Sequence, residues 1–122
     1  MKLLDSSVWL AHLLEANTKA SALIEADENL FCSLLSLFEV KKKLIKEQFM
    51  VEKVQASLEF IKKRAIIVNL SEEMVHSAVE LSLTYKLSTV DALIYASALN
   101  LKAEFITADN DFRGLKDAII ID

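Results

Sequence analysis

Five short apolar runs, separated by longer segments with the apolar spacing of helices, constrain this sequence more than any other feature. The runs are KLLD (2–5), NLFCS (29–33), AIIVNL (65–70), AEFIT (103–107) and AIIID (118–122). Uninterrupted apolar runs of this length are typical of strands that are covered on both faces, as in a parallel sheet. The alternation therefore predicts the α/β class: a three-layer α/β/α sandwich around a central, mostly parallel sheet of four to five strands.

The segments between these runs predict helices. We expect them after Ser6 or Ser7, over 17–27, from Ser33 or Ser36 onward, over 49–64, from SEEM (71–74) to Tyr85, and over 89–100. The 122 residues include one glycine and no proline, so sharp turns and flexible linkers are scarce. We therefore expect one domain that spans residues 1–122.

The composition argues against several classes of protein. A single cysteine, Cys32, permits neither a disulfide framework nor a zinc site, and its apolar neighbours predict a buried core position. The apolar run at the N-terminus is too short for a signal peptide, and no apolar segment reaches the length that spans a bilayer. We expect a soluble, cytoplasmic protein.

Charge is distributed unevenly along the chain. The net charge is −4, yet residues 41–64 hold eight of the 14 Lys and Arg residues and three of the 18 Asp and Glu residues. A basic helical segment beside an acidic remainder is compatible with phosphate contacts near a carboxylate site. The simpler interpretation is a solvated helical face, which explains most runs of charge.

Several isolated acids stand where a parallel sheet binds its ligands. Asp5 and Asp109 follow two of the predicted strands, Asp91 lies near the start of an apolar helix, and Glu39 and Asp111 complete the set. Ligands of open α/β sheets bind beyond the carboxyl ends of the strands. Each acid also has a structural interpretation. Asp5 can cap a helix, Glu39 can form a capping box with Ser36, and Asp109 and Asp111 can be turn formers.

Converging carboxylates would need cations. Asp91 complements the dipole of its helix, but a carboxylate at the edge of an apolar helix needs a cation or hydrogen-bond donors nearby. Ligands that are all oxygen suit Mg²⁺ or Mn²⁺ rather than zinc. Such ions can lower the pKa of a bound water and stabilise the leaving oxygen of a phosphodiester. That chemistry requires no serine nucleophile and no histidine base, so His12 and His76 are expected to be bystanders.

Four segments in this order resemble a known family. LLDSSVWL, SLFEVKKKL, STVDALIYASAL and FITADNDF resemble the PIN-domain ribonucleases, in particular the small VapC-type toxins of toxin–antitoxin pairs. The resemblance implies a metal-dependent endoribonuclease that hydrolyses RNA phosphodiester bonds. It also implies a small protein antitoxin and a homodimer, for which Trp9, Phe49 and Phe60 are candidate interface residues.

The resemblance assigns roles to individual residues. Asp5, Glu39, Asp91 and Asp109 are the expected catalytic residues, and together with Asp111 they are the expected ligands of Mg²⁺ or Mn²⁺. Ser6 and Thr107 are expected to hold carboxylates in place. Candidates for contacts with the RNA backbone are Lys41, Lys42, Lys43 and Lys46.

Two other functions remain open at this point. A PIN-like scaffold could bind RNA or a protein partner without cutting. A phosphatase or phospho-receiver could share the α/β layers. A haloacid-dehalogenase-like phosphatase would need a second aspartate two residues after Asp5, where the chain has Ser7. A receiver would need paired acids at the first strand and a lysine near the last strand, and neither is evident.

Overall fold

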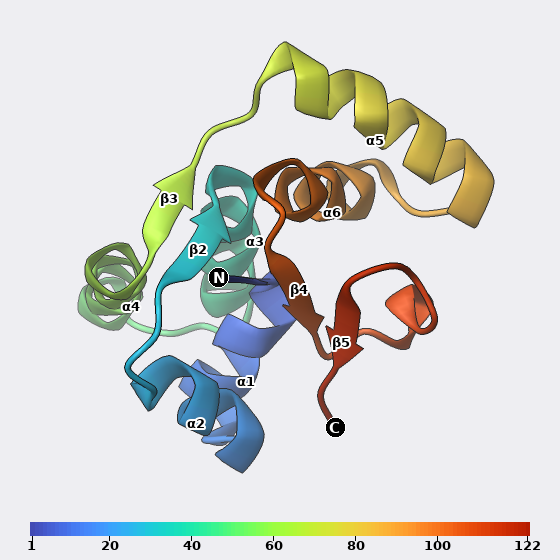
Figure 1. The fold of residues 1–122 in the computed structure, drawn as a ribbon. Coiled ribbons are helices and arrows are strands. Elements are labelled where there is room, and N and C mark those ends of the chain that lie inside the picture. Colours follow the sequence, from blue (N-terminus) through green and yellow to red (C-terminus); the bar gives the residue numbers. More distant parts are fainter.

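A single five-stranded sheet organises the chain. The computed structural model describes all residues, 1–122. The strands are β1 (Lys2–Leu4), β2 (Leu30–Ser33), β3 (Ile66–Val68), β4 (Glu104–Thr107) and β5 (Ala118–Ile120). Their order is β3-β2-β1-β4-β5, and every neighbouring pair is parallel. The predicted α/β class is confirmed, with a sheet that is parallel throughout (Figure 1).

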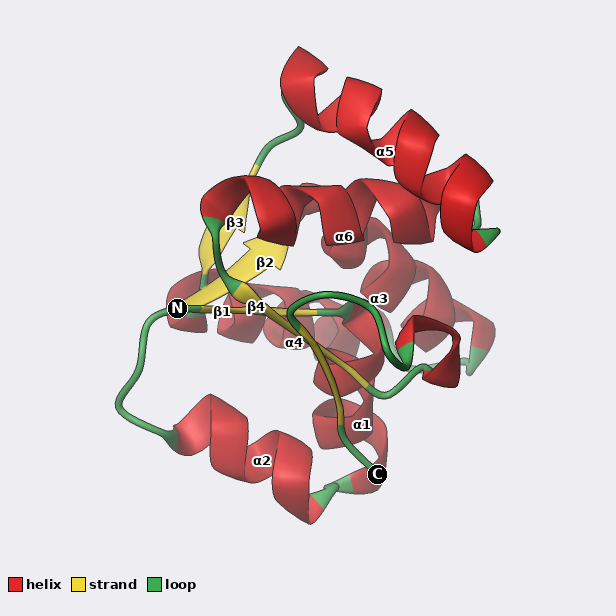
Figure 2. Ribbon diagram, turned by 45° about the vertical axis from the view of Figure 1, so that its right-hand side comes forward, coloured by secondary structure: helices red, strands yellow, loops and turns green.

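Helices cover both faces of this sheet. They are α1 (Ser6–Glu15), α2 (Thr18–Glu25), α3 (Leu34–Lys46), α4 (Val51–Arg64), α5 (Glu72–Tyr85) and α6 (Thr89–Leu101), with a short 3-10 turn, η1 (Asn110–Phe112). Figure 2 shows α5 and α6 on one side of the strands and α1 to α4 on the other. No helix has the length and apolar character needed to cross a membrane.

Two apolar cores follow from the alternation of side chains along each strand. On β1, Leu4 joins the core under α1 to α4, whereas Leu3 joins the core under α5 and α6. In the second core Phe105 and Phe112 pack edge to face with ring centroids 4.8 Å apart. Phe112 is part of η1, so this contact fixes the loop that follows β4.

The structure decides between the two caps expected for α3 and excludes one candidate interface residue. Ser33 is the cap, since its side chain accepts a hydrogen bond from the amide of Leu35. Ser36 lies inside the helix and is fully buried, so the alternative interpretation of Ser36 and Glu39 as a capping box is excluded. Trp9 is 0% exposed and belongs to the core, so it cannot be an interface residue.

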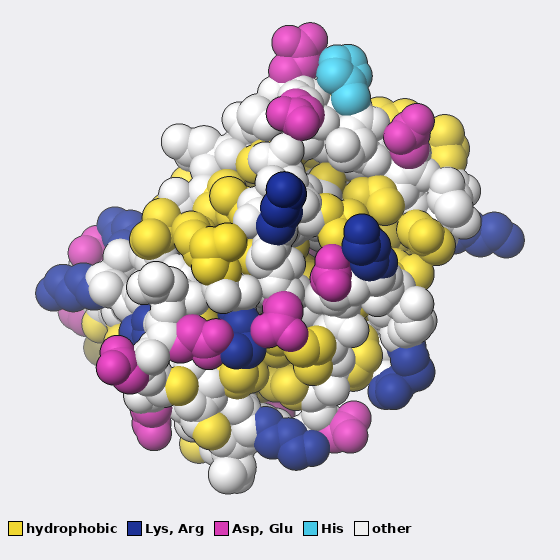
Figure 3. Space-filling view, in the orientation of Figure 1, with side chains coloured by type: hydrophobic (Ala, Val, Ile, Leu, Met, Phe, Trp, Pro, Cys, Tyr) yellow, Lys and Arg dark blue, Asp and Glu magenta, His cyan; other side chains and the backbone are white.

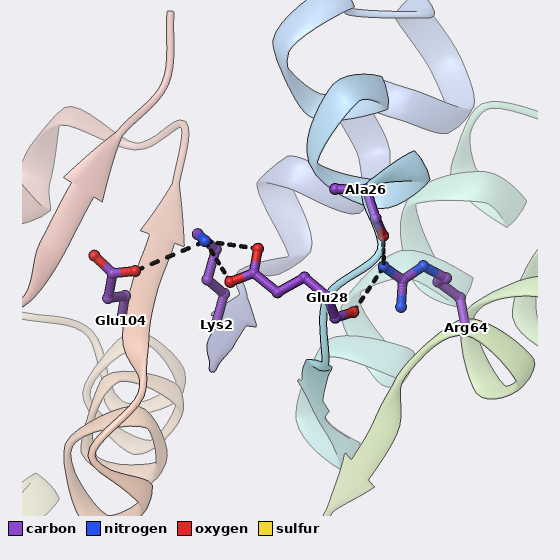
Figure 4. Close-up of polar contacts among 5 residues, drawn as sticks. All are labelled: Lys2, Ala26, Glu28, Arg64 and Glu104. Atoms are coloured by element: carbon purple, nitrogen blue, oxygen red, sulfur yellow. Dashed lines mark hydrogen bonds and ion pairs between the residues drawn. The ribbon is translucent and has the colours of Figure 1, made fainter.

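Charged groups at the amino edge of the sheet satisfy one another (Figure 4). Lys2 on β1 forms ion pairs with Glu28 and, at 3.8 Å, with Glu104. The hydrogen bond to Glu28 raises the pKa of Lys2. The Arg64 guanidinium, at the end of α4, donates to the carbonyls of Ile24, Ala26 and Glu28. The charged side chains at this edge of the sheet are therefore paired with other groups of the same chain.

Candidate active site

The opposite, carboxyl edge of the sheet gathers the predicted acids. β1 and β4 are neighbours, with Leu4 in register with Ile106, so Asp5 directly after β1 and Asp109 shortly after β4 leave the sheet side by side. Glu39 comes from α3, which follows β2, and Asp91 comes from the first turn of α6. Four elements thus contribute carboxylates to one edge.

Asp5 is the most buried of these acids, at 4% exposure. Its carboxylate is the N-cap of α1 and accepts a hydrogen bond from the amide of Ser6 at 2.8 Å. The other carboxylate oxygen accepts from Thr107 Oγ1 at 2.8 Å and from Ser7 Oγ at 3.0 Å. A carboxylate with three donors is held in one orientation, although no positive group pairs with it.

Ser6 links two of the acids. Its hydroxyl donates to Glu39 Oε1 at 2.7 Å and lies 3.4 Å from Asp5 Oδ1. These contacts join the start of α1 to the second turn of α3, which are 33 positions apart in sequence. Ser6 therefore sets the distance between Asp5 and Glu39.

Thr107 and Ser7 attach the loop after β4 to Asp5. Thr107 Oγ1 accepts a hydrogen bond from the amide of Asp109 at 3.0 Å, in addition to donating to Asp5. Ser7 Oγ accepts from the amide of Ala108 at 2.9 Å. Sequence reasoning assigned no site role to Ser7. The only signal was a second serine after Asp5, and its partner lies about a hundred positions away.

The acids influence one another electrostatically. Burial raises the pKa of Asp5 from 3.8 to about 6, the hydrogen bonds from Thr107 and Ser7 oppose that rise, and the charges of Asp91 and Glu39 add to it. Burial is also the main cause that raises the pKa of Asp91, and the charges of Asp109 and Asp111 raise it further. The five predicted acids therefore share one region of negative potential.

The donor set fits a hard divalent cation, although the acids are not assembled around one point. No group of three or more Asp, Glu, His or Cys side chains is arranged so that it could hold a metal ion. Asp109 uses one oxygen to accept from the amide of Asp111 at the start of η1, and Asp111 is exposed. The buried, uncompensated charge of Asp5 is nevertheless the environment that a nearby Mg²⁺ or Mn²⁺ would stabilise. Metal binding by these residues stays a prediction.

The two histidines lie outside this edge of the sheet. His12 is hydrogen bonded to Ser21 and stacked on Phe60, with ring centroids 5.5 Å apart. His76 pairs with Glu72 on α5. Neither histidine forms a hydrogen bond or ion pair with Asp5, Glu39, Asp91, Asp109 or Asp111.

Three of the four candidate lysines share a hollow with Glu39. The hollow has a volume of about 290 Å³ and is lined by Phe38, Glu39, Lys42, Lys43, Lys46 and Val90. Lys41 instead lines an adjoining hollow of about 280 Å³ with Phe38, Lys42 and Ile45. Because Val90 precedes Asp91, the first hollow extends from α3 toward the start of α6.

Comparisons with known proteins bear on the family and the fold of the chain. A family model described as the PIN domain matches residues 2–118. A toxin–antitoxin complex from Klebsiella pneumoniae contains a chain that is 26% identical, with 98% of this chain and 96% of that chain covered and a TM-score of 0.79. VapBC2 from Rickettsia felis, bound to a promoter DNA fragment, is 17% identical over 98% of this chain and 96% of that one, with a TM-score of 0.81.

A third solved structure has the same fold. It is the sarcin–ricin loop cleaving toxin VapC20 of Mycobacterium tuberculosis, at 15% identity, 95% coverage of each chain and a TM-score of 0.77. A search of curated proteins found no match. At such low identities the second and third structures support the fold alone.

Proposed function

We propose that this chain, which belongs to the PIN-domain family, is a metal-dependent endoribonuclease and the toxin of a toxin–antitoxin pair. In this proposal residues 1–122 form one PIN domain. The observation that carries it is the Asp5 carboxylate, which is buried at the carboxyl edge of a parallel sheet beside the charges of Glu39 and Asp91. A fold that needed only stability would place a neutral group there.

The chain's own residues have the following roles in the proposed reaction. Asp5, Asp91 and Asp109 would hold Mg²⁺ or Mn²⁺, and Asp111 would be an auxiliary ligand. When bound, the ion supplies a water of lowered pKa and positive charge for the leaving oxygen of the phosphodiester. Glu39 binds the ion or orients the attacking water, and the Ser6 hydroxyl holds Glu39 for either task.

Two further groups support these carboxylates. Thr107 keeps Asp5 in position and attaches the loop that carries Asp109. Lys42, Lys43 and Lys46, which line the hollow beside Glu39, hold phosphates of the RNA backbone. Lys41 faces the adjoining hollow and contributes less.

The partners proposed are an RNA substrate, a small protein antitoxin and a second copy of the chain. The support for an antitoxin is the similarity to a chain of a toxin–antitoxin complex. RNA and such an antitoxin are molecules of the cytoplasm, and we place the activity there. Phe49 and Phe60, which are both partly exposed, stay candidate residues for the homodimer, and light scattering of the purified chain tests that state.

RNA cleavage with Mg²⁺ or Mn²⁺ tests the proposed activity. We expect wild-type protein to cut RNA, and Asp5→Asn and Asp91→Asn to lose at least a hundred-fold in rate. Asp27→Asn is the matched control, because Asp27 is an exposed acid that precedes β2 at the amino edge of the sheet. Equal rates in all four proteins would refute the catalytic assignment and favour a non-catalytic scaffold.

A further inference from the structure

Phe38 is an aromatic side chain that the fold leaves uncovered beside the proposed active site. It is 64% exposed and directly precedes Glu39 in α3, whose Ser36, Val40 and Leu44 are buried in the structure. The helix periodicity that turns those three inward turns Phe38 outward. A single exposed apolar side chain is common on protein surfaces, so the interest of Phe38 depends on the groups that surround it next to Glu39.

The surroundings of Phe38 are basic. Phe38 and Lys42 line both hollows described above, and the other lysines of α3 line one or the other. Lys43 forms an ion pair with Glu47 at 3.0 Å, whereas Lys41, Lys42 and Lys46 pair with no carboxylate. Lys42 Nζ lies over the Phe38 ring, 6.0 Å from its centroid. Phe38 therefore shares the two hollows with four lysines, three of which have no internal partner.

An aromatic face among unpaired cations matches the chemistry of one kind of ligand. Proteins that bind single-stranded nucleic acid combine positive charge for the phosphates with aromatic side chains on which bases stack. An apolar surface of another protein would cover Phe38 as well, but it would also bury the charges of Lys42 and Lys46 without partners. The observations therefore favour RNA over a protein as the occupant.

We propose that an unpaired base of the RNA stacks on the ring of Phe38. In this arrangement the phosphate next to that base lies in the hollow that Phe38 shares with Glu39, beside the proposed active site. This inference rests on the proposed ribonuclease function. Bases within an A-form helix stack on each other and offer no free face. Phe38 is then a specificity-determining residue, which selects RNA with an unstacked base beside the bond that is cut.

Binding measured without cleavage tests the role of Phe38. The probe is a labelled single-stranded RNA of randomised sequence, about 12 nucleotides long, with a duplex of the same length as its counterpart and no divalent metal present. We expect Phe38→Leu to weaken single-strand binding about five- to hundred-fold, whereas Phe38→Trp retains it. Duplex binding should change little in either variant. A 2-aminopurine base in the probe should lose its fluorescence on binding to wild type but not to Phe38→Leu.

The matched control is Tyr85→Leu, because Tyr85 is a partly exposed aromatic residue at the end of α5, on the other helical layer. We expect this variant to bind RNA as wild type does. If Phe38→Leu binds single-stranded RNA as tightly as wild type, or if it loses dimerisation in place of RNA affinity, the stacking role is wrong.

Kinetics separate this inference from the proposed function. Phe38→Leu should raise KM for RNA and leave kcat nearly unchanged, because the stacked base is bound in ground state and transition state alike. If wild type cleaves RNA and Asp5→Asn does not, while Phe38→Leu keeps the wild-type KM, only the stacking role fails. If wild type neither binds nor cleaves RNA, both fail.

Discussion

The Asp5 carboxylate caps α1, accepts hydrogen bonds from Thr107 and Ser7, and lies beside the charges of Glu39 and Asp91. Its pKa is raised from 3.8 to about 6. Because the folded-state pKa lies above the unfolded value, the folded chain binds this proton more tightly than the unfolded chain. The contribution of the protonated Asp5 to the free energy of unfolding is therefore complete below about pH 4 and is lost as the pH rises through about 6.

At the residue scale this gives a prediction for the metal-free protein. Asp5→Asn should be more stable than wild type at about pH 7, by up to about 3 kcal/mol, because the variant never buries a charge and asparagine is also a good N-cap. The difference should vanish below about pH 4. Urea unfolding at a series of pH values measures it. Parallel stability curves for the two proteins would contradict the raised pKa of Asp5.

Ser6 allows a second residue-scale prediction. Ser6→Ala removes the hydroxyl that donates to Glu39 but leaves the carboxylates in place. We expect the cleavage rate to fall about 10- to 100-fold, with a small change in the free energy of unfolding. Steady-state RNA cleavage and thermal melting measure the two effects. Asn17→Ala, which removes the cap of α2, is the comparison, because it should lower stability and spare the rate per folded molecule.

Individual residues differed in how well the sequence could predict them. The meeting of Asp5 and Asp109 at one edge could be predicted, because acids that follow the strands of a parallel sheet leave it at the same edge; their role in a site stays a prediction. The cap of α3 stayed open between Ser33 and Ser36, because both have the chemistry of a cap and only the folded chain decides between them. Ser7 was missed because its contact with Ala108 depends on the pairing of β1 with β4.

At the scale of elements, α3 carries Glu39 and the lysines on one exposed side. Lys42→Glu and Lys46→Glu should weaken RNA binding, whether single-stranded or duplex, and should reduce the dependence of affinity on salt, because each removes one phosphate contact. Lys63→Glu on α4, an exposed lysine without an ion pair, is the control. RNA affinity measured at several salt concentrations is the test. If Lys63→Glu lost as much RNA affinity as Lys42→Glu and Lys46→Glu, the overall charge of the protein, and not α3, would attract the RNA.

A substitution at the end of α4 should lower stability without changing the candidate active site. Arg64→Ala removes the donors to the carbonyl of Ile24 in the last turn of α2 and to the carbonyls of Ala26 and Glu28, which follow that helix (Figure 4). We therefore expect a loss of about 2 kcal/mol in the free energy of unfolding. Cleavage per folded molecule should not change, since Arg64 lies at the opposite edge of the sheet from Asp5. Chemical denaturation and kinetics on the same samples measure both. A large loss of activity in a fully folded Arg64→Ala protein would contradict this separation of the two edges.

The elements themselves were mostly evident in the sequence. The predicted strands and helices all occur, because apolar runs and helical spacing reflect local requirements of backbone and burial. The predicted strand over 65–70 forms only over Ile66–Val68, at an edge of the sheet where fewer residues can pair. The loop over 108–113 contains η1, whose anchor, Phe112, is buried by a contact with Phe105 that no local pattern reveals.

At the scale of the whole molecule, folding and metal binding should be linked. A ligand that binds only the folded chain stabilises it by about 2.7 kcal/mol at a hundred times its Kd. Mn²⁺ or Mg²⁺ should therefore raise the Tm of wild type, and the rise should disappear in Asp5→Asn while Asp27→Asn retains it. Thermal melting with and without the ion measures this. An unchanged wild-type Tm at high Mn²⁺ would point to a scaffold that binds no metal.

The order of the strands was beyond sequence reasoning. Continuous apolar runs show that the strands are covered on both faces, but they do not say which strands are neighbours. The order β3-β2-β1-β4-β5 places the first and fourth strands together, and this pairing brings Asp5 to Thr107. The convergence of the acids was therefore expected from family resemblance and from general properties of parallel sheets, not from the apolar runs themselves.

That pairing has a consequence for the chain during synthesis. β1 leaves the ribosome before β4, one of its two neighbours in the sheet, because β4 comes much later in the chain. Until residues 104–107 emerge, β1 has an open side, and Asp5 lacks the hydroxyl of Thr107. A nascent chain that stops short of residue 107 therefore lacks the contact that holds Asp5 in place, and we expect no RNA cleavage by such a chain until β4 has emerged.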